Sequence, residues 1–308
     1  MYLYNTVMVI IFLSQTGVGV LGNSLFLCFY GFTLFSSHRS RPMDPILVQL
    51  TLANTIVLLS QGCPLIIFYL GKGYVLGSAG CKTAYYLHRV SRGLSICTTC
   101  LLSVFRAITI SPNNSRLAKL KIRVQQFIRP SCLLCWIFSM IVEISMPIYI
   151  TGSRTNNNSH RDGLDLLYCY WEKSFKEVVI LPSLRDIFFV GCMVCTSGYM
   201  VFLLYRHHQR IQHIHRTSLS PKTFPEVKAT QTILLLVGIF VSAYCISCGF
   251  TLYTVYVIQS GAWIVIVTTF IALCFPTISP FLLIHRDTQT SSSCCASWQR
   301  SYLYAQNS

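Results

Sequence analysis

The stretch from Ala229 to His285 contains no aspartate, glutamate, lysine or arginine. As a single helix it would be about 85 Å long, because an α-helix rises about 1.5 Å per residue. The hydrocarbon core of a bilayer is only about 30 Å thick. The segment must therefore fold back on itself, and its polar break is Gln259-Ser260-Gly261. We predict two membrane-spanning helices here, at about residues 229–258 and 262–284.

The composition agrees with a membrane protein. The chain is 53% hydrophobic and 11% charged, whereas soluble domains carry about 25% charged residues. A net charge of +15 would suggest nucleic acid in a soluble protein, but here the charges cluster between apolar segments, so no nucleic-acid partner is expected. We predict a single all-α domain, residues 1–308, with a tail at 285–308. Its five further spans are expected at about 7–35, 45–70, 81–110, 130–150 and 182–205.

The distribution of basic residues predicts the orientation. With the N-terminus outside, cytoplasmic segments would hold 15 lysines and arginines and external segments only six. Such an excess is typical of the cytoplasmic side. We therefore expect the N-terminus outside and the C-terminus in the cytoplasm. The basic segment from Arg206 to Lys228 is expected to bind anionic lipid headgroups or the surface of a partner protein.

The span from Cys81 to Pro112 carries arginines inside an apolar segment. Placing arginine in the hydrocarbon region costs at least about 2.5 kcal/mol, so such residues normally face the interior of a bundle. Tyr85, His88, Arg89 and Arg92 recur at helical spacing and share one face. We predict a central helix whose polar face lines a cavity.

Within this span, HRVSRGLSICTTCLLSVFRAITISP (residues 88–112) resembles the third helix of the vomeronasal type-1 receptors. Similar matches are LTLAN (50–54) in the second helix and ISPFLLI (278–284) in the seventh. The resemblance implies a pheromone-sensing G-protein-coupled receptor of the plasma membrane. Its partners would be a small organic chemosignal and an inhibitory-class heterotrimeric G protein. In place of the Asp-Arg-Tyr motif of rhodopsin-like receptors, the chain has Phe105-Arg106-Ala107, which lacks the acidic residue.

Ten of the fifteen cysteines fall into two groups. Cys81 and Cys169 are expected at the external boundary, which is oxidising, and the wider rhodopsin-like pattern implies a disulfide between them. Four Cys-x-x-Cys pairs lie instead in apolar helices without flanking histidine or carboxylate. In a soluble protein such pairs would suggest zinc, but buried thiols behave as small apolar groups. We expect packing, with no metal and no cofactor.

The charges within the membrane suggest a ligand site among the third, fifth and sixth helices. Three arginines, Arg89, Arg92 and Arg185, lie in the outer half of their helices. Only Glu143 and Asp186 offset them there, which leaves one positive charge in excess. An amphipathic ligand with an anionic or acceptor-rich end would supply the missing partner. In the alternative, Arg92 pairs permanently with one of the two acids. The expected ligand-binding residues are Tyr85, His88, Arg89, Arg92, Arg185, Asp186, Tyr253 and Tyr256.

Other functional positions are expected at the two membrane surfaces. The cytoplasmic residues expected to contact the G protein are Arg106, Lys119, Arg206, Arg210 and Lys228. The sequon at Asn157 is expected to be glycosylated, and the one at Asn113 should face the cytoplasm unmodified. Cys294-Cys295 in the tail is either palmitoylated or unmodified.

Two other function classes stay open at this point. A bitter-taste-like receptor is the alternative within the receptors, although the two arginines and ISPFLLI fit the vomeronasal family better. A transporter would also place charges in mid-membrane, but its usual inverted repeats and broken helices are not found in the sequence. No nucleophile–base pairing or phosphate-binding loop is found, so we expect no enzyme.

Overall fold

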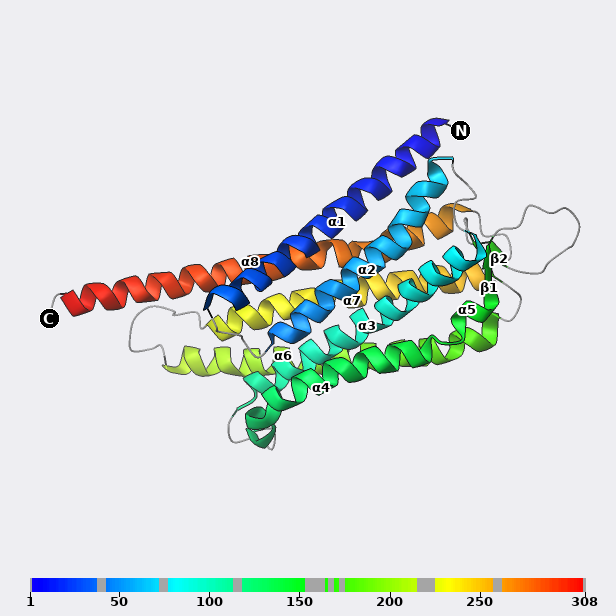
Figure 1. Cartoon of the computed structure of the whole chain (residues 1–308). Coiled ribbons are helices and arrows are strands. Elements are labelled where there is room, and N and C mark those ends of the chain that lie inside the picture. The colour runs from blue at the N-terminus through cyan, green and yellow to red at the C-terminus, as the bar shows by residue number, and fades with distance from the viewer. Residues whose placement is uncertain are drawn as a thin grey trace, which may run out of the picture.

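In the computed structural model the chain forms a bundle of seven long helices (Figure 1). The structure describes residues 2–37, 43–71, 77–112, 118–152, 164–165, 169–171, 175–214, 225–256 and 262–306, with the backbone alone over some helix ends. Each long helix contains a segment long and apolar enough to cross a membrane. The predicted seven-helix fold is thereby confirmed. The helices are α1 (Tyr2–Ser37), α2 (Asp44–Tyr69), α3 (Ser78–Ile110), α4 (Ala118–Val142), α6 (Phe175–Ile214), α7 (Pro225–Tyr256) and α8 (Ala262–Gln306).

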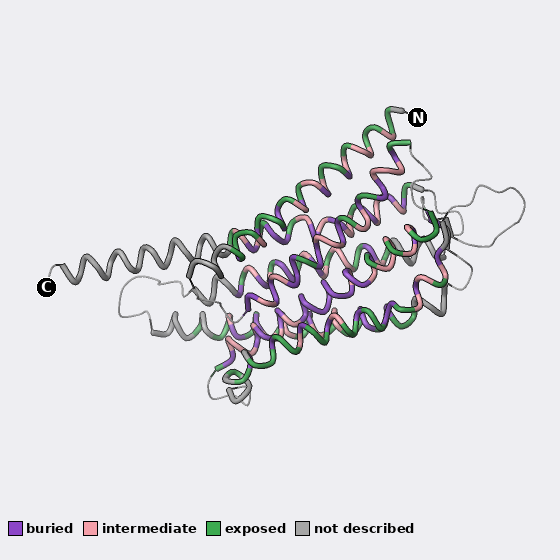
Figure 2. The backbone as a smooth tube through the Cα atoms, in the orientation of Figure 1, coloured by how far each residue is buried: buried purple, intermediate pink, exposed green. Residues whose placement is uncertain are grey.

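Helix α3 is the most enclosed element of the bundle. In its most apolar window 67% of the residues are buried, against 17% in α6 and 50% in α2. Buried positions follow one another along its middle (Figure 2). Its arginines therefore lie against other helices, as the prediction of a central helix requires.

A proline explains how α1 and α8 are joined. Pro280 has no N–H and cannot donate to the carbonyl of Pro276, one helical turn earlier. The side-chain amide of Asn23 donates to that carbonyl instead, at 2.9 Å. A Cβ at the neighbouring Gly22 would lie only 3.1 Å from Cγ of Pro280. The Gly-Asn pair thus combines close approach with a hydrogen bond to the freed carbonyl.

Helix α4 is displaced relative to the expected span of 130–150. It begins at Ala118 because the residues before Pro130 are mostly good helix formers and continue the helix outward. It ends at Val142 because Pro147 cannot donate to the carbonyl of Glu143. The N–H of Met146 bonds to that carbonyl at 3.0 Å, and the short helix α5 (Met146–Tyr149) follows. Glu143 is thereby left at the end of α4.

Two other helices are longer than their apolar spans. Helix α6 begins at Phe175 and ends at Ile214, beyond the expected 182–205. Helix α8 continues through the expected tail to Gln306, and its last turns project beyond the bundle (Figure 1). Residues 286–306 contain no glycine or proline to stop a helix. The predicted bounds were too short because hydropathy identifies only the apolar part of a helix that can lie in lipid.

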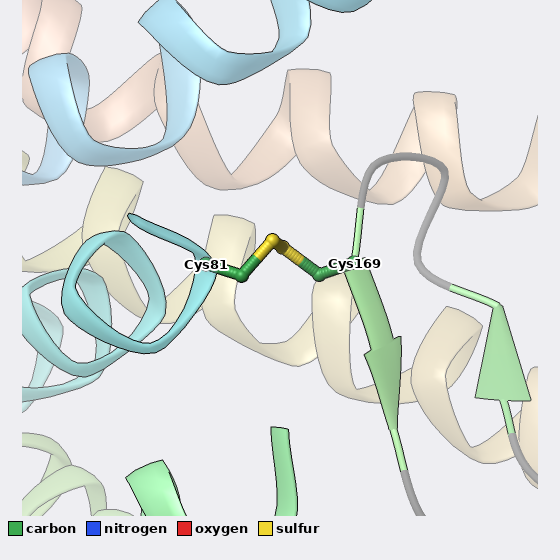
Figure 3. The surroundings of a disulfide bond; sticks show 2 residues. All are labelled: Cys81 and Cys169. Atoms are coloured by element: carbon green, nitrogen blue, oxygen red, sulfur yellow. A yellow bond between two sulfur atoms is a disulfide. The ribbon is translucent and has the colours of Figure 1, made fainter. Parts of the chain in front are cut away.

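A small sheet forms between α5 and α6, at the end of the bundle that holds the N-terminus (Figure 1). Strands β1 (Ile150–Gly152), β2 (Leu164–Asp165) and β3 (Cys169–Trp171) pair antiparallel in the order β1-β3-β2. The expected disulfide between Cys81 and Cys169 is present, with Cα atoms 5.9 Å apart (Figure 3). The disulfide joins this sheet to the first turn of α3. The sheet itself was not predicted, because the sequence indicated an all-α domain.

Candidate functional site

Four ionised side chains meet between α3, α6 and the end of α4. Arg89 Nε lies 3.2 Å from Glu143 Oε2. Arg185 Nη1 lies 2.9 Å from Glu143 Oε1, an ion pair whose angles fall outside hydrogen-bond geometry. Arg185 also donates from Nε to Asp186 Oδ1 at 2.9 Å, and its Nη2 lies 2.8 Å from the same oxygen. Two cations and two anions thus form a neutral group, which we call the ion-pair cluster.

The ion-pair cluster is almost dry. The Glu143 side chain is 0% exposed and that of Arg185 is 2% exposed. Isolated charges in such a place would cost several kcal/mol each, so their mutual pairing is a requirement of the fold. The break before Pro147 sets the position of Glu143, and the pairing joins α3, α4 and α6.

A glycine makes room for Arg185. A Cβ added to Gly93 would lie 2.8 Å from Cζ of Arg185 and in closer contact with Nη1. The guanidinium therefore packs directly on the backbone of α3. Sequence reasoning missed this residue, because one glycine between arginines gives no pattern that identifies a packing surface for a side chain of another helix.

Arg92 stays outside the ion-pair cluster. Among the described residues it forms no ion pair with Glu143 or Asp186, and its guanidinium carbon lies 5.4 Å from the centroid of the Tyr244 ring. The Tyr244 hydroxyl donates to Asp186 Oδ2 at 3.2 Å. The alternative that Arg92 pairs permanently with one of these acids is therefore wrong for this structure. Tyr244 also escaped prediction, since nothing in the sequence of its helix relates it to arginine.

Arg92 lines a cavity of about 50 Å³ between α2, α3, α7 and α8. This volume is room for roughly three or four water molecules. The polar wall comes from α3, where His88, Arg92 and Ser95 face one way at helical spacing. The remaining walls are mostly apolar. The lining residues are Val57, His88, Arg92, Ser95, Phe240, Ala243, Tyr244, Ser247, Ala272, Phe275 and Pro276.

The cavity is displaced from the expected site among the third, fifth and sixth spans. No described residue of α6 lines it, because the charged residues of α6 are turned into the ion-pair cluster. Helix α8 lines the cavity instead, with Phe275 packed edge-on against Phe240 of α7 at 4.7 Å between centroids.

Two polar groups beside Arg92 have no hydrogen-bond partner among the described residues. One is Nδ1 of the buried His88, and the other is Nη2 of Arg89. A buried polar group without a partner costs about 1–3 kcal/mol. Of the two residues only His88 lines the cavity, and its unpartnered Nδ1 indicates a site that a ligand or water completes.

Hydrogen bonds that begin at Ser95 in the cavity wall link three helices. Ser95 on α3 donates to Asn54 Oδ1 at 2.8 Å. Asn54 on α2 donates through Nδ2 to the hydroxyl of Ser279 on α8, also at 2.8 Å. The Ser95 hydroxyl hydrogen is thereby used within the protein, although the residue lines the cavity.

The remaining predicted ligand residues divide by environment. Tyr85 is half-buried, and its ring lies 6.2 Å from that of His88. Arg89, Arg185 and Asp186 belong to the ion-pair cluster, so Arg92 and His88 are the predicted residues that the structure places at the cavity. The side chains of Tyr253 and Tyr256 lie outside the described residues.

At the opposite end of the bundle, two of the five residues expected to meet a G protein have described side chains. Arg106 is half-buried near the end of α3, and Arg206 is exposed on α6. Nearby, the hydroxyls of Ser111 and Tyr199 lie 3.0 Å apart and join the end of α3 to α6. The side chains of Lys119, Arg210 and Lys228, the glycosylation site Asn157 and the side chains of Cys294-Cys295 are outside the described part.

Four cysteines of the Cys-x-x-Cys pairs are buried in the described part of the bundle, whereas Cys195 and Cys245 are exposed. Cys97 and Cys135 share one buried apolar cluster, and Cys100 and Cys132 share another. Most of their neighbours are apolar side chains such as leucine, isoleucine and phenylalanine.

The comparisons with known proteins agree on one family. The model of the vomeronasal organ pheromone receptor family matches residues 6–296. Vomeronasal type-1 receptor 1 of Homo sapiens is 41% identical over 296 residues, covering 95% of this chain and 84% of the relative. Vomeronasal type-1 receptor 4 of Homo sapiens is 42% identical, with 94% and 96% covered. Vomeronasal type-1 receptor 90 of Rattus norvegicus is 37% identical, with 91% of each chain covered.

Proposed function

The chain belongs to the vomeronasal type-1 receptor family of chemosensory G-protein-coupled receptors, and from that premise we propose that it detects a small organic chemosignal and activates an inhibitory-class G protein. Its seven apolar helices and its relatives make it a multi-pass membrane protein. In this proposal the whole chain is one receptor domain of the plasma membrane, with the disulfide end and Asn157 outside.

The observation that carries the proposal is the charge of Arg92 at the cavity. Arg89 and Arg185 have acidic partners, whereas Arg92 has only an aromatic ring among the described residues. A guanidinium holds a carboxylate or sulfate through two parallel hydrogen bonds. Phe240 and Phe275 offer an apolar surface for the rest of the molecule. We therefore propose an amphipathic ligand with an anionic or acceptor-rich end.

The contact between Arg92 and Tyr244 suggests how binding is transmitted. A ligand anion would compete with the Tyr244 ring for the guanidinium, and Tyr244 belongs to α7. The cavity must also widen to admit an organic molecule, since its volume matches only a few waters. A ligand then favours the active arrangement in proportion to its differential affinity for that state.

Replacing Arg92 by glutamine tests this ligand site. We expect Arg92→Gln to reach the cell surface normally, because it removes a charge that has no acidic partner among the described residues. The response to sulfated or carboxylated agonists should weaken about 10- to 100-fold, the value of a charge-assisted hydrogen bond of about 1.5–3 kcal/mol. The measurement is agonist-evoked calcium in cells that express the receptor with a suitable G protein.

Two comparisons make the result specific. Neutral analogues of the same agonists should lose much less potency, and Arg92→Lys should be intermediate because it keeps the charge without the planar fork. Equal losses for anionic and neutral agonists would show that Arg92 does not recognise an anion.

The second half of the proposal concerns the end of the bundle opposite the disulfide. We propose that the G protein is contacted by Arg106, by the segment from Arg116 to Arg129 and by the segment from Arg206 to Lys228. Arg106→Ala should reduce agonist-evoked signalling at least about tenfold and leave ligand binding near the wild-type value. Radioligand binding and calcium responses on the same cells separate the two effects, and parallel loss of both would assign Arg106 to the fold instead.

A further inference from the structure

We infer that the cavity beside Arg92 is a binding site for a small inorganic anion of the chloride type, which the receptor holds in the absence of an organic ligand. The reason is that the described side chains around Arg92 carry one more positive charge than negative charges. The ion-pair cluster is neutral by itself, with two arginines against Glu143 and Asp186. The charge of Arg92 is additional to it.

The Tyr244 ring does not remove this charge. A cation over an aromatic face is stabilised by the ring quadrupole, but the pair keeps its full positive charge. Glu143 and Asp186, the acids of the cluster, already serve Arg89 and Arg185. The half-buried guanidinium therefore faces the cavity as a cation without an anion among the described residues.

The walls of the cavity favour an anion over water alone. Val57, Phe240, Ala243, Ala272 and Phe275 are apolar and lower the local dielectric, which strengthens the attraction between Arg92 and a negative charge. The free-energy cost of desolvating an ion is offset only when a counter-charge and hydrogen bonds interact with that ion. Arg92 supplies the counter-charge.

His88 supplies a second donor to the same place. It is buried, lines the cavity one helical turn from Arg92, and its Nδ1 has no partner among the described residues. A neutral imidazole carries one N–H, so the Nδ1–H form donates to an anion next to the guanidinium. The hydroxyl of Ser95 donates to Asn54 and does not compete for this role.

The size of the cavity selects the class of anion. A volume of about 50 Å³ accommodates a halide and one or two waters, but no organic acid with a hydrocarbon body. An agonist with an anionic end would displace the small ion, so the two compete. This inference concerns the receptor without agonist and does not depend on the organic ligand that we propose.

The test is the thermal stability of the purified full-length receptor in sodium chloride, sodium bromide and sodium gluconate at equal ionic strength. Chloride and bromide should raise the midpoint of unfolding by about 2–4 °C over gluconate, in a saturable manner, because an ion bound only to the folded state stabilises it. Gluconate is too large for the cavity. Tryptophan fluorescence follows the unfolding.

Two variants assign the effect to this cavity. Arg92→Gln should abolish the difference between chloride and gluconate, whereas Lys82→Gln, which removes a half-buried cation from the first turns of the same helix, should keep it. Ala243→Asp places a tethered carboxylate in the cavity wall. In gluconate it should be as stable as the wild type in chloride, and it should gain nothing from chloride.

Equal stability of the wild type in all three salts would overturn the inference, and so would a chloride effect that persists in Arg92→Gln. Either result leaves the proposed function standing if anionic agonists still require Arg92. Conversely, a chloride effect confined to Arg92, together with agonists that ignore Arg92→Gln, would support the ion site and refute the proposed ligand contact.

Discussion

Replacing Glu143 by glutamine is expected to cause the largest loss of folded receptor among single substitutions in the ion-pair cluster. Glu143 pairs with both Arg89 and Arg185 and is completely buried. Without its charge, Asp186 is the only acid left in the cluster to balance two arginines. Breaking a buried ion pair on one side costs about 3–5 kcal/mol. Surface expression, measured by flow cytometry on an N-terminal epitope, should fall to a small fraction of the wild-type level.

Charge balance provides the control for this substitution. The double variant Glu143→Gln with Arg89→Gln restores a neutral group around Arg185 and Asp186, and it should recover a substantial part of the surface expression. Arg89→Gln alone should be milder than Glu143→Gln, because Arg185 and Asp186 then still have partners. Normal expression of Glu143→Gln would contradict the structural role of the cluster.

Replacing Gly93 by alanine should destabilise the receptor although alanine favours helices. The new Cβ would lie 2.8 Å from Cζ of Arg185, closer than such atoms pack. Arg185 is fixed by ion pairs to Glu143 and Asp186 and cannot turn aside without breaking one of them. Overpacking of this kind costs about 1–3 kcal/mol. The measurement is the thermal unfolding midpoint of the purified receptor.

A matched glycine on another helix separates sterics from helix propensity. A Cβ at Gly191 of α6 would meet no atom within 4 Å, so Gly191→Ala should be neutral or stabilising by up to about 1 kcal/mol. Gly93→Ala should therefore unfold several degrees below Gly191→Ala. If both variants have the same midpoint, Arg185 does not pack on the backbone of α3 as described.

The seven spans were predictable because they depend on local chemistry. An apolar segment such as the one from Ala229 to His285 has no alternative to crossing the membrane and returning, whatever its neighbours are. The central position of α3 was predictable for a similar reason, because arginine side chains are too costly to expose to lipid. The helix ends were less predictable, since hydropathy does not register the hydrogen bonds that continue α6 and α8 beyond the apolar region.

The partners of the charged side chains were decided by the tertiary structure alone. The sequence indicated that Arg89, Arg92 and Arg185 in the outer half of the membrane region face only Glu143 and Asp186, and hence leave one positive charge in excess. It did not determine which arginine keeps that charge, because pairing depends on which helices touch and where each side chain points. Because α4 ends next to Glu143, this carboxylate can pair with both Arg89 and Arg185. Because Gly93 has no side chain, the guanidinium of Arg185 fits against α3. Arg92, one turn further along α3, is left facing the cavity.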